Sequence, residues 1–299
     1  MPPTQAPTAP TDDAPDDSPG LVLCFNMSDP TGAGGLSADV AAVAAVGGHA
    51  LPVTTGVLVR DSAEIFDSYA VDVDVVIEQA RAVLEDGTIH AFKVGNLENV
   101  EAVSAVAELL ADYPDTPVVT YVGNLAHVDE QVFEDYLSAV KELLVPQSYV
   151  LCGTASLLAQ LLLPDWDAEQ PPTPWQLVQA TTEAGCEHLL VTGLVTPDGY
   201  IENILLSAES VLVRERFERF DVSFVGAGDT LSAALAGMLT GDVDLPQATS
   251  EALSFLDQSL ESGFRPGMGL VIPDRFFWAQ PPQDELPDDE AGFPPSRLQ

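Results

Sequence analysis

Gly226, Ala227, Gly228 and Asp229 form the part of this sequence whose types and spacing are best suited to chemistry. Glycines allow a tight turn, and the backbone N–H groups of such a turn can point together at an anion. The apolar helical pattern that follows would place the positive end of a helix dipole at the same point. Asp229 would then stand beside the anion as a base for a reacting hydroxyl group. These are the requirements of phosphoryl transfer, although a glycine-rich turn followed by Asp is also a common helix N-cap.

A second glycine-rich segment follows the first apolar strand pattern and opens an apolar helix pattern. Gly32, Gly34 and Gly35 would let the backbone approach a ligand closely. Asp29 and Asp39 carry carboxylates that are candidates for hydrogen bonds to that ligand. An Asp-Pro pair, such as the one that starts at Asp29, is also common in simple turns. This segment therefore predicts a ligand-binding turn.

The charge balance of the chain limits its partners. The 299 residues include 47 acidic and 10 basic side chains, which gives a formal net charge of −37. Such a surface repels nucleic acids and anionic membranes, so neither is expected as a partner. It suits a protein that stays soluble at high salt, where self-repulsion is screened, and we hypothesise a halophilic or salt-tolerant source.

Neither the cysteines nor the histidines indicate a metal site, so metal ligands are left unassigned. The three cysteines are widely spaced in apolar surroundings, which is typical of reduced core thiols. The four histidines are scattered, without the helical spacing of metal ligands. The N-terminal segment lacks the basic and apolar regions of a signal peptide, and no apolar run is long enough to cross a membrane. We therefore expect a cytoplasmic location.

Short β-rich runs alternate with helical patterns through most of the chain. We expect strands at 21–26, 50–58, 91–94, 117–121, 149–151, 188–192, 201–206 and 210–216. We expect helices at 36–46, 73–84, 100–112, 129–144, 154–163, 174–184, 229–240 and 246–262. This alternation predicts an α/β fold, a three-layer α/β/α sandwich with a mostly parallel central sheet. The domain would span 20–280, between disordered tails at 1–19 and 281–299 that are too rich in Pro and acidic residues to form a core.

With both glycine-rich segments in view, the chain resembles the ribokinase-like superfamily. More closely, it is similar to the hydroxymethylpyrimidine/phosphomethylpyrimidine kinases of thiamine biosynthesis. The resemblance rests on the segments at 26–39, 47–55, 92–97, 226–235 and 264–278. It covers roughly residues 20–279 and is strongest near the two ends of that range.

The resemblance implies that the chain uses ATP and Mg²⁺ to phosphorylate the hydroxymethyl group of a small heteroaromatic alcohol, and that it forms a homodimer. It places the substrate beside Asp29, Gly32, Gly34, Gly35, Asp39, Arg60 and Asn96. It makes Gly226, Ala227 and Gly228 the anion hole, with Asp229 as the base where this kinase family usually has a cysteine. It places the nucleotide near Lys93, Thr192, Gly193 and Thr230, although Lys93 is equally consistent with a solvated strand end.

Several positions depart from the family pattern. Arg60 stands where the family has Glu or Gln against the pyrimidine amine, and an arginine cannot accept a hydrogen bond. Asn96 replaces a methionine that packs near the ring. Thr120 replaces an Asp, and Thr154 and Leu157 replace the Asn and Glu of a motif that helps to hold hydrated magnesium. These changes leave two alternatives open: a pyridoxal/pyridoxine-type vitamin kinase, and a catalytically weak relative that binds a pyrimidine or nucleotide.

Overall fold

A mixed sheet runs through the part of the molecule that the computed structural model describes, residues 18–123 and 128–279. Its nine strands are ordered β3-β2-β1-β4-β5-β6-β7-β8-β9. Their bounds are β1 (Leu21–Ser28), β2 (His49–Arg60), β3 (Ile65–Ala70), β4 (Ala91–Val94), β5 (Val118–Val122), β6 (Val150–Thr154), β7 (His188–Val195), β8 (Tyr200–Ser207) and β9 (Val211–Glu218). Strands β2 to β7 in this order are parallel, and β3, β8 and β9 pair antiparallel at the two edges.

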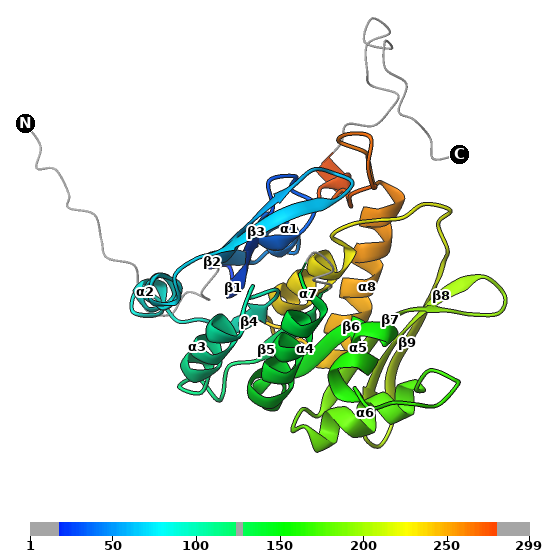
Figure 1. Cartoon of the computed structure of the whole chain (residues 1–299). Coiled ribbons are helices and arrows are strands. Elements are labelled where there is room, and N and C mark those ends of the chain that lie inside the picture. Colours follow the sequence, from blue (N-terminus) through cyan, green and yellow to red (C-terminus); the bar gives the residue numbers. More distant parts are fainter. Residues whose placement is uncertain (1–17, 124–127, 280–299) are drawn as a thin grey trace, which may run out of the picture.

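Helices cover both faces of the sheet (Figure 1). On one face lie α1 (Gly35–Ala45), α7 (Ala227–Met238) and α8 (Leu245–Glu261). On the other lie α2 (Val73–Leu84), α3 (Val100–Leu110), α4 (Glu130–Ala139), α5 (Ala155–Leu162) and α6 (Pro174–Glu183). A π-helical turn, Val140–Leu144, continues α4. The result is the expected three-layer α/β/α architecture.

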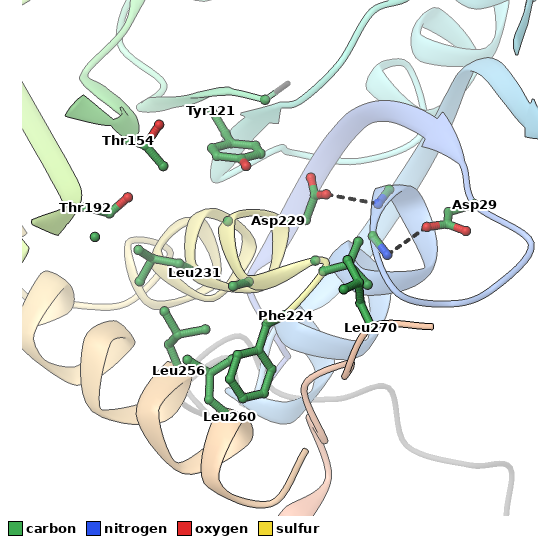
Figure 2. A pocket seen from close by; sticks show the side chains of 18 of the residues that line it. Asp29, Tyr121, Thr154, Thr192, Phe224, Asp229, Leu231, Leu256, Leu260 and Leu270 are labelled. Carbon is green, nitrogen blue, oxygen red and sulfur yellow. Dashed lines mark hydrogen bonds between the residues drawn. The ribbon is translucent and has the colours of Figure 1, made fainter. Parts of the chain in front are cut away.

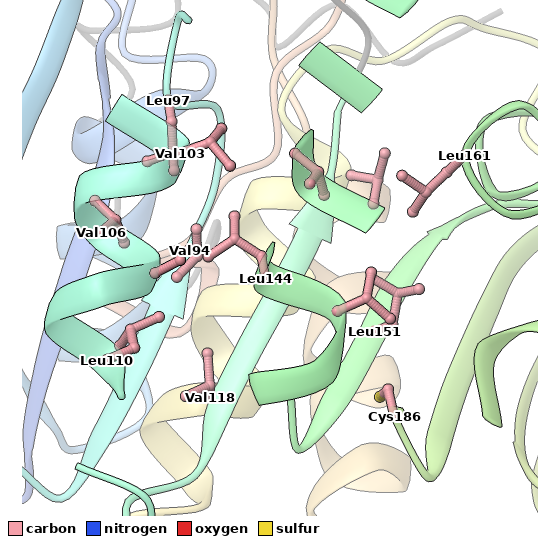
Figure 3. Close-up of a cluster of buried hydrophobic side chains, with 14 of the residues drawn as sticks. Val94, Leu97, Val103, Val106, Leu110, Val118, Leu144, Leu151, Leu161 and Cys186 are labelled. Atoms are coloured by element: carbon pink, nitrogen blue, oxygen red, sulfur yellow. The ribbon is translucent and has the colours of Figure 1, made fainter. Parts of the chain in front are cut away.

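Each face of the sheet has its own hydrophobic core, as the central strand β1 illustrates. Leu23 and Phe25 point into the core under α2 to α6, and Val22 and Cys24 point into the core under α1, α7 and α8. All four side chains are fully buried. Successive residues of a strand face opposite sides, so a strand covered on both faces needs apolar side chains on both of them. Figure 3 shows the first of these cores packed between α3 and the sheet.

Strands β2 and β3 form an arm that extends beyond the rest of the sheet toward the C-terminal part of the described chain (Figure 1). The turn between them is tied to that part by two hydrogen bonds. The backbone N–H of Leu270 donates to the carbonyl oxygen of Ser62 at 2.9 Å, and the N–H of Gly269 donates to Ser62 Oγ at 3.1 Å. The arm is thereby held over the carboxyl ends of the strands, where ligands bind in sheets of this kind.

The pattern-based prediction located all eight expected helices and all eight expected strands, with shifts of a few residues at their ends. It missed β3, an edge strand whose side chains are largely exposed and therefore lack an apolar run. The predicted tails at 1–19 and 281–299 lie almost entirely outside the described residues, and the domain limits stay a prediction. Within the described residues, none of the helices has the length and apolar character needed to cross a membrane.

Candidate active site

The two glycine-rich turns meet at the N-termini of α1 and α7. Gly226 has a φ of +84°, and a Cβ there would collide with the carbonyl oxygen of Ala33 in the first turn. A Cβ on Gly34 would lie 2.9 Å from Asp229 Oδ2. Only glycine permits this backbone conformation and this close approach of the two turns. The two glycine-rich turns therefore border one cleft.

Helices α1 and α7 differ from the others in how they begin. The other six have an Asp, Asn or Thr side chain that caps the first turn, whereas α1 and α7 start at Gly34 and Gly226 without a side-chain cap. Uncapped N–H groups at a helix N-terminus favour a bound anion. Asp229 is the third residue of α7, in its first turn, and is therefore not its N-cap.

Both turns line one cavity of about 760 Å³. Figure 2 shows Asp29 and Asp229 toward one end, Thr154 and Thr192 toward the other, and Tyr121 between them. The second end is mostly apolar, with walls from strands β8 and β9, the segment before α7, and α8. Its apolar residues are Ile201, Phe217, Phe220, Phe224, Leu253, Leu256 and Leu260. The cavity thus joins a polar compartment to an apolar slot across the N-terminus of α7.

Asp229 is held by three donors at the mouth of the polar compartment. Its Oδ1 accepts from Lys93 Nζ at 2.8 Å and from Asn26 Nδ2 at 2.9 Å. Its Oδ2 accepts from the backbone N–H of Gly35 at 3.1 Å. The side chain remains 15% exposed, and Asp229 lines the cavity. The carboxylate is therefore fixed in orientation while still accessible from the cavity.

Lys93 connects Asp229 to a second carboxylate. Its Nζ lies 2.8 Å from Asp39 Oδ1 as well as from Asp229 Oδ1, and the side chains of Lys93 and Asp39 are fully buried. Asn26 Nδ2 also donates to Asp39, at 2.9 Å. Within this group one positive charge faces two negative ones.

This arrangement separates the pKa values of the two carboxyl groups. Burial raises the pKa of Asp39 to about 6, and Lys93 only partly offsets it. Burial would also raise the pKa of Asp229, but the charge of Lys93 and the hydrogen bonds from Lys93, Asn26 and Gly35 outweigh it, so that pKa lies below its ordinary value. Asp229 is consequently ionised at neutral pH and able to accept a proton.

Arg275 links the two glycine-rich turns through hydrogen bonds to both of them. Its Nε donates to Thr230 Oγ1 at 2.9 Å, its Nη1 to the carbonyl of Gly32 at 3.1 Å, and its Nη2 to the carbonyl of Ala33. The side chain is largely buried, so a positive charge sits close under the turn at Gly226. Its fork of donors fixes the relative position of α7 and the first glycine turn.

Comparison with known proteins agrees with this geometry. The family model described as phosphomethylpyrimidine kinase matches residues 29–274. This chain belongs to that family. The hydroxymethylpyrimidine/phosphomethylpyrimidine kinase of Streptomyces coelicolor is 30% identical over 88% of this chain and 96% of its own. The Salmonella typhimurium protein of the same name is 28% identical over 80% and 90%.

Solved structures show the same fold at lower identity. An ADP complex of Bacillus subtilis pyridoxal kinase has a TM-score of 0.79 and 19% identity, covering 88% of this chain and 99% of its own. The phosphomethylpyrimidine kinase of Clostridium difficile has a TM-score of 0.65 and 17% identity, covering 79% and 98%. The ribokinase-like fold expected from the sequence is thereby confirmed.

Most residues that the sequence assigned to the site do line the cavity. In the polar compartment these are Asp29, Gly34, Gly35, Arg60 and Asn96, together with the second turn at Gly226, Ala227, Gly228 and Asp229. Thr192 and Gly193 lie toward the apolar end. In this member of the phosphomethylpyrimidine kinase family, the fold thus brings together residues that are up to about two hundred positions apart in the sequence.

Four assigned residues do not reach the cavity as expected, which corrects their assignment. Lys93 neither faces the nucleotide phosphates nor is solvated, because it is buried between two carboxylates. Asp39 pairs with Lys93 and does not border the substrate. Thr230 is buried and bonds to Gly226 and Arg275. Gly32 does not line the cavity, and its carbonyl accepts from Arg275.

The described residues do not fit a magnesium site built from protein ligands. No group of three or more His, Cys, Asp or Glu side chains among them is placed to hold a metal ion. Thr120 is buried and hydrogen-bonded to Ser148 at 2.6 Å, and Thr154 caps α5 by accepting from the N–H of Leu157. Thr120 and Thr154, two of the positions where the sequence departs from the family pattern, therefore have structural roles.

Three important residues were not singled out from the sequence. The side-chain amide of Asn26 donates to the carboxylates of both Asp39 and Asp229. The Tyr121 ring packs so close to Gly228 that a Cβ on this glycine would collide with it. Arg275 holds the two glycine-rich turns together. Asn26 offered a signal, because a polar residue inside a fully buried strand needs partners. Tyr121 and Arg275 lie far from the glycine motifs in sequence and offered none.

Proposed function

We propose that this chain transfers the γ-phosphoryl group of ATP to the hydroxymethyl group of a small heteroaromatic alcohol, with hydroxymethylpyrimidine and its monophosphate as the favoured substrates. Membership of the phosphomethylpyrimidine kinase family supports this proposal. The single observation that carries it is the position of Asp229: an ionised carboxylate beside an uncapped helix N-terminus, inside a cavity large enough for two ligands.

In the proposed reaction, the alcohol lies in the polar compartment with its hydroxyl group near Asp229. The Asp229 carboxylate takes the hydroxyl proton as the alcohol oxygen attacks the γ-phosphorus and the bond to the β-phosphate bridging oxygen breaks. The N–H groups of the turn at 226–228, together with the α7 dipole, stabilise the charge on the transferred group. Lys93 and Asn26 orient the carboxylate and do not touch the substrate.

The apolar slot suits the base of the nucleotide. Phe217, Phe224, Leu256 and Leu260 give it the flat apolar walls that an adenine ring prefers, and it opens directly onto the N-terminus of α7. Kinases use ATP together with Mg²⁺, and we propose both here. Because the described residues form no metal cluster, the ion would be held chiefly by phosphate oxygens and water.

Incubating the full chain with ATP, Mg²⁺ and hydroxymethylpyrimidine or its monophosphate tests this proposal. ADP formation should depend on the alcohol, and the phosphorylated pyrimidine should appear by mass spectrometry in equal amount. Calorimetry with the alcohol alone and with a non-hydrolysable ATP analogue should be run beside it. Tight binding of both ligands without turnover would instead support the ligand-binding relative.

A pyridoxal/pyridoxine-type kinase is the second candidate, and the position of Arg60 favours it. Arg60 lines the polar compartment and can donate to an oxygen substituent such as the ring hydroxyl of pyridoxal. The same assay with pyridoxal and pyridoxine distinguishes the two candidates. We further propose a cytoplasmic homodimer without nucleic-acid or membrane partners, in keeping with the net charge of −37.

A further inference from the structure

The hydrogen-bond inventory of the polar compartment reveals which substrate groups it can receive. Asp29 lines this compartment, and its side chain is fully buried. Oδ1 accepts from Thr31 N at 2.9 Å and from Thr31 Oγ1 at 2.7 Å. Oδ2 accepts from Gly34 N at 3.0 Å and from Arg60 Nη1 at 3.3 Å. Both oxygens of Asp29 are thus already satisfied and have little capacity to accept from a ligand.

Most of the other acceptors near Arg60 are also engaged, and Asn96 is the exception. Asn26 Oδ1 accepts from the backbone N–H groups of Met27 and Asn96. The side-chain oxygen of Asn96 is buried and has no hydrogen-bond partner within the described residues, so it could accept from a ligand amine. Glu64 lines the cavity only at its exposed rim, where water competes for its carboxylate. Asp229 remains, but the proposed reaction assigns it to the hydroxyl group.

Arg60, in contrast, has donors to spare. Its Nε donates to the carbonyl of Asp61 at 3.0 Å, and its Nη1 makes the long contact with Asp29. Its Nη2 donates to nothing within the described residues, although the side chain is only 7% exposed and lines the cavity. A guanidinium nitrogen that is mostly withdrawn from water gains most from an acceptor on a bound ligand.

We infer that Arg60 makes this site selective for a heteroaromatic alcohol that carries an oxygen acceptor, a carbonyl or a phenolate, on the ring edge facing Arg60. The same ring with an amine at that edge would set donor against donor and leave Arg60 unpaired. This inference rests on the proposed function in one respect: it assumes that the alcohol occupies the polar compartment. It revises the favoured ring named there, because hydroxymethylpyrimidine carries an amine and its oxygen analogue would bind more tightly. It concerns ring recognition, not the transfer step.

A matched pair of ligands tests the inference. The first is hydroxymethylpyrimidine, and the second is its analogue with the ring amine replaced by a carbonyl oxygen. Their dissociation constants are measured by calorimetry in the presence of a non-hydrolysable ATP analogue, and kcat/KM is measured with ATP. The wild type should favour the oxygen analogue by about tenfold or more in binding, because one hydrogen bond to a charged donor is at stake.

Variants locate the source of the preference. Arg60→Gln, which can accept from an amine, should abolish or reverse it, and Arg60→Lys should retain part of it. Glu64→Gln, at the rim, should keep it. Circular dichroism and binding of the ATP analogue verify that each variant is folded.

The outcomes separate this inference from the proposed function. A wild type that binds the amine as well as or better than the oxygen analogue overturns the inference, as does a preference that survives in Arg60→Gln, or binding of neither ring. Selective binding of the oxygen analogue without phosphorylation of either ring upholds the inference and contradicts the proposed function.

Discussion

The ammonium nitrogen of Lys93 lies 2.8 Å from Oδ1 of Asp229, although the two residues are 136 positions apart in the sequence. The chain has only two lysines, and one of them is completely buried in this contact. A charge without partners is costly to bury, so a fully buried lysine needs negatively charged partners such as Asp39 and Asp229. Here that charge keeps Asp229 ionised and correctly oriented at the mouth of the α7 turn.

Replacing Lys93 should therefore damage both stability and chemistry. We expect Lys93→Met to lower the free energy of unfolding by about 3–5 kcal/mol, because it leaves two buried carboxylates without their cation. It should also raise the pKa of Asp229, which would shift the acid limb of the pH dependence of kcat to higher pH. The other lysine provides the control: among the described residues Lys141 donates to the carbonyl of Leu162 alone, and Lys141→Met should cost about 1 kcal/mol. Equal losses in urea denaturation would contradict this account.

Asp39 should make stability depend on pH in the direction opposite to an ordinary ion-paired carboxylate. Its pKa is about 6 in the folded chain, above the value of the unfolded chain, so the folded state holds the proton more tightly. The wild type should thus lose about 1 kcal/mol relative to Asp39→Asn as the pH rises from about 5 to about 7. Urea denaturation of both proteins across this range measures the difference. A constant difference would show that Asp39 does not titrate there.

The contact between Gly226 and Ala33 should make Gly226 intolerant of any side chain. Gly226→Ala combines a left-handed φ with a collision against the Ala33 carbonyl, and we expect a loss of more than roughly 3 kcal/mol together with loss of nucleotide binding. Gly47 is the matched control, because it has a φ of +91° but open space around its missing Cβ. Gly47→Ala should cost only about 1–2 kcal/mol and leave nucleotide binding intact. Similar thermal unfolding of the two variants would contradict the proposed fit of the turns.

The net charge of −37 should make the folded state salt-dependent. Added KCl screens the repulsion among acidic side chains. The midpoint temperature of unfolding should therefore rise as the KCl concentration is increased from about 0.1 M to molar values. The KM for ATP should fall over the same range, because the nucleotide is also an anion. Thermal scans and initial rates at several KCl concentrations measure both effects. A midpoint that decreases with salt would argue against adaptation to a saline environment.

The fold could be predicted because periodicity and glycine turns are local signals. Strand β4 (Ala91–Val94) is apolar except for Lys93, and α2 (Val73–Leu84) shows an amphipathic pattern, so both were located with correct ends. Strand β3 escaped because it is an exposed edge strand that is defined by pairing with β2 and not by its own composition.

The site was predictable only as far as its backbone motifs extend. The glycine turns indicated where α1 and α7 begin, and these two helices lack a side-chain cap of their own. The partners of Lys93 depend on the tertiary approach of α1 and α7 to β4, which no local pattern encodes. Its burial did have a signal, since a lysine inside a four-residue strand that is buried on both faces cannot easily reach water. Arg275 comes from beyond α8 and is recognisable only once the turns are assembled.

The most direct test of the central claim is the rate of phosphoryl transfer by Asp229→Asn. This variant keeps the shape of the side chain but cannot act as a base, so kcat with ATP and the preferred ring alcohol should fall by about 10²–10⁴-fold. Calorimetry with a non-hydrolysable ATP analogue should show nucleotide binding within a few-fold of the wild type. A variant that binds nucleotide and retains wild-type kcat would contradict the assignment of Asp229 as the catalytic base.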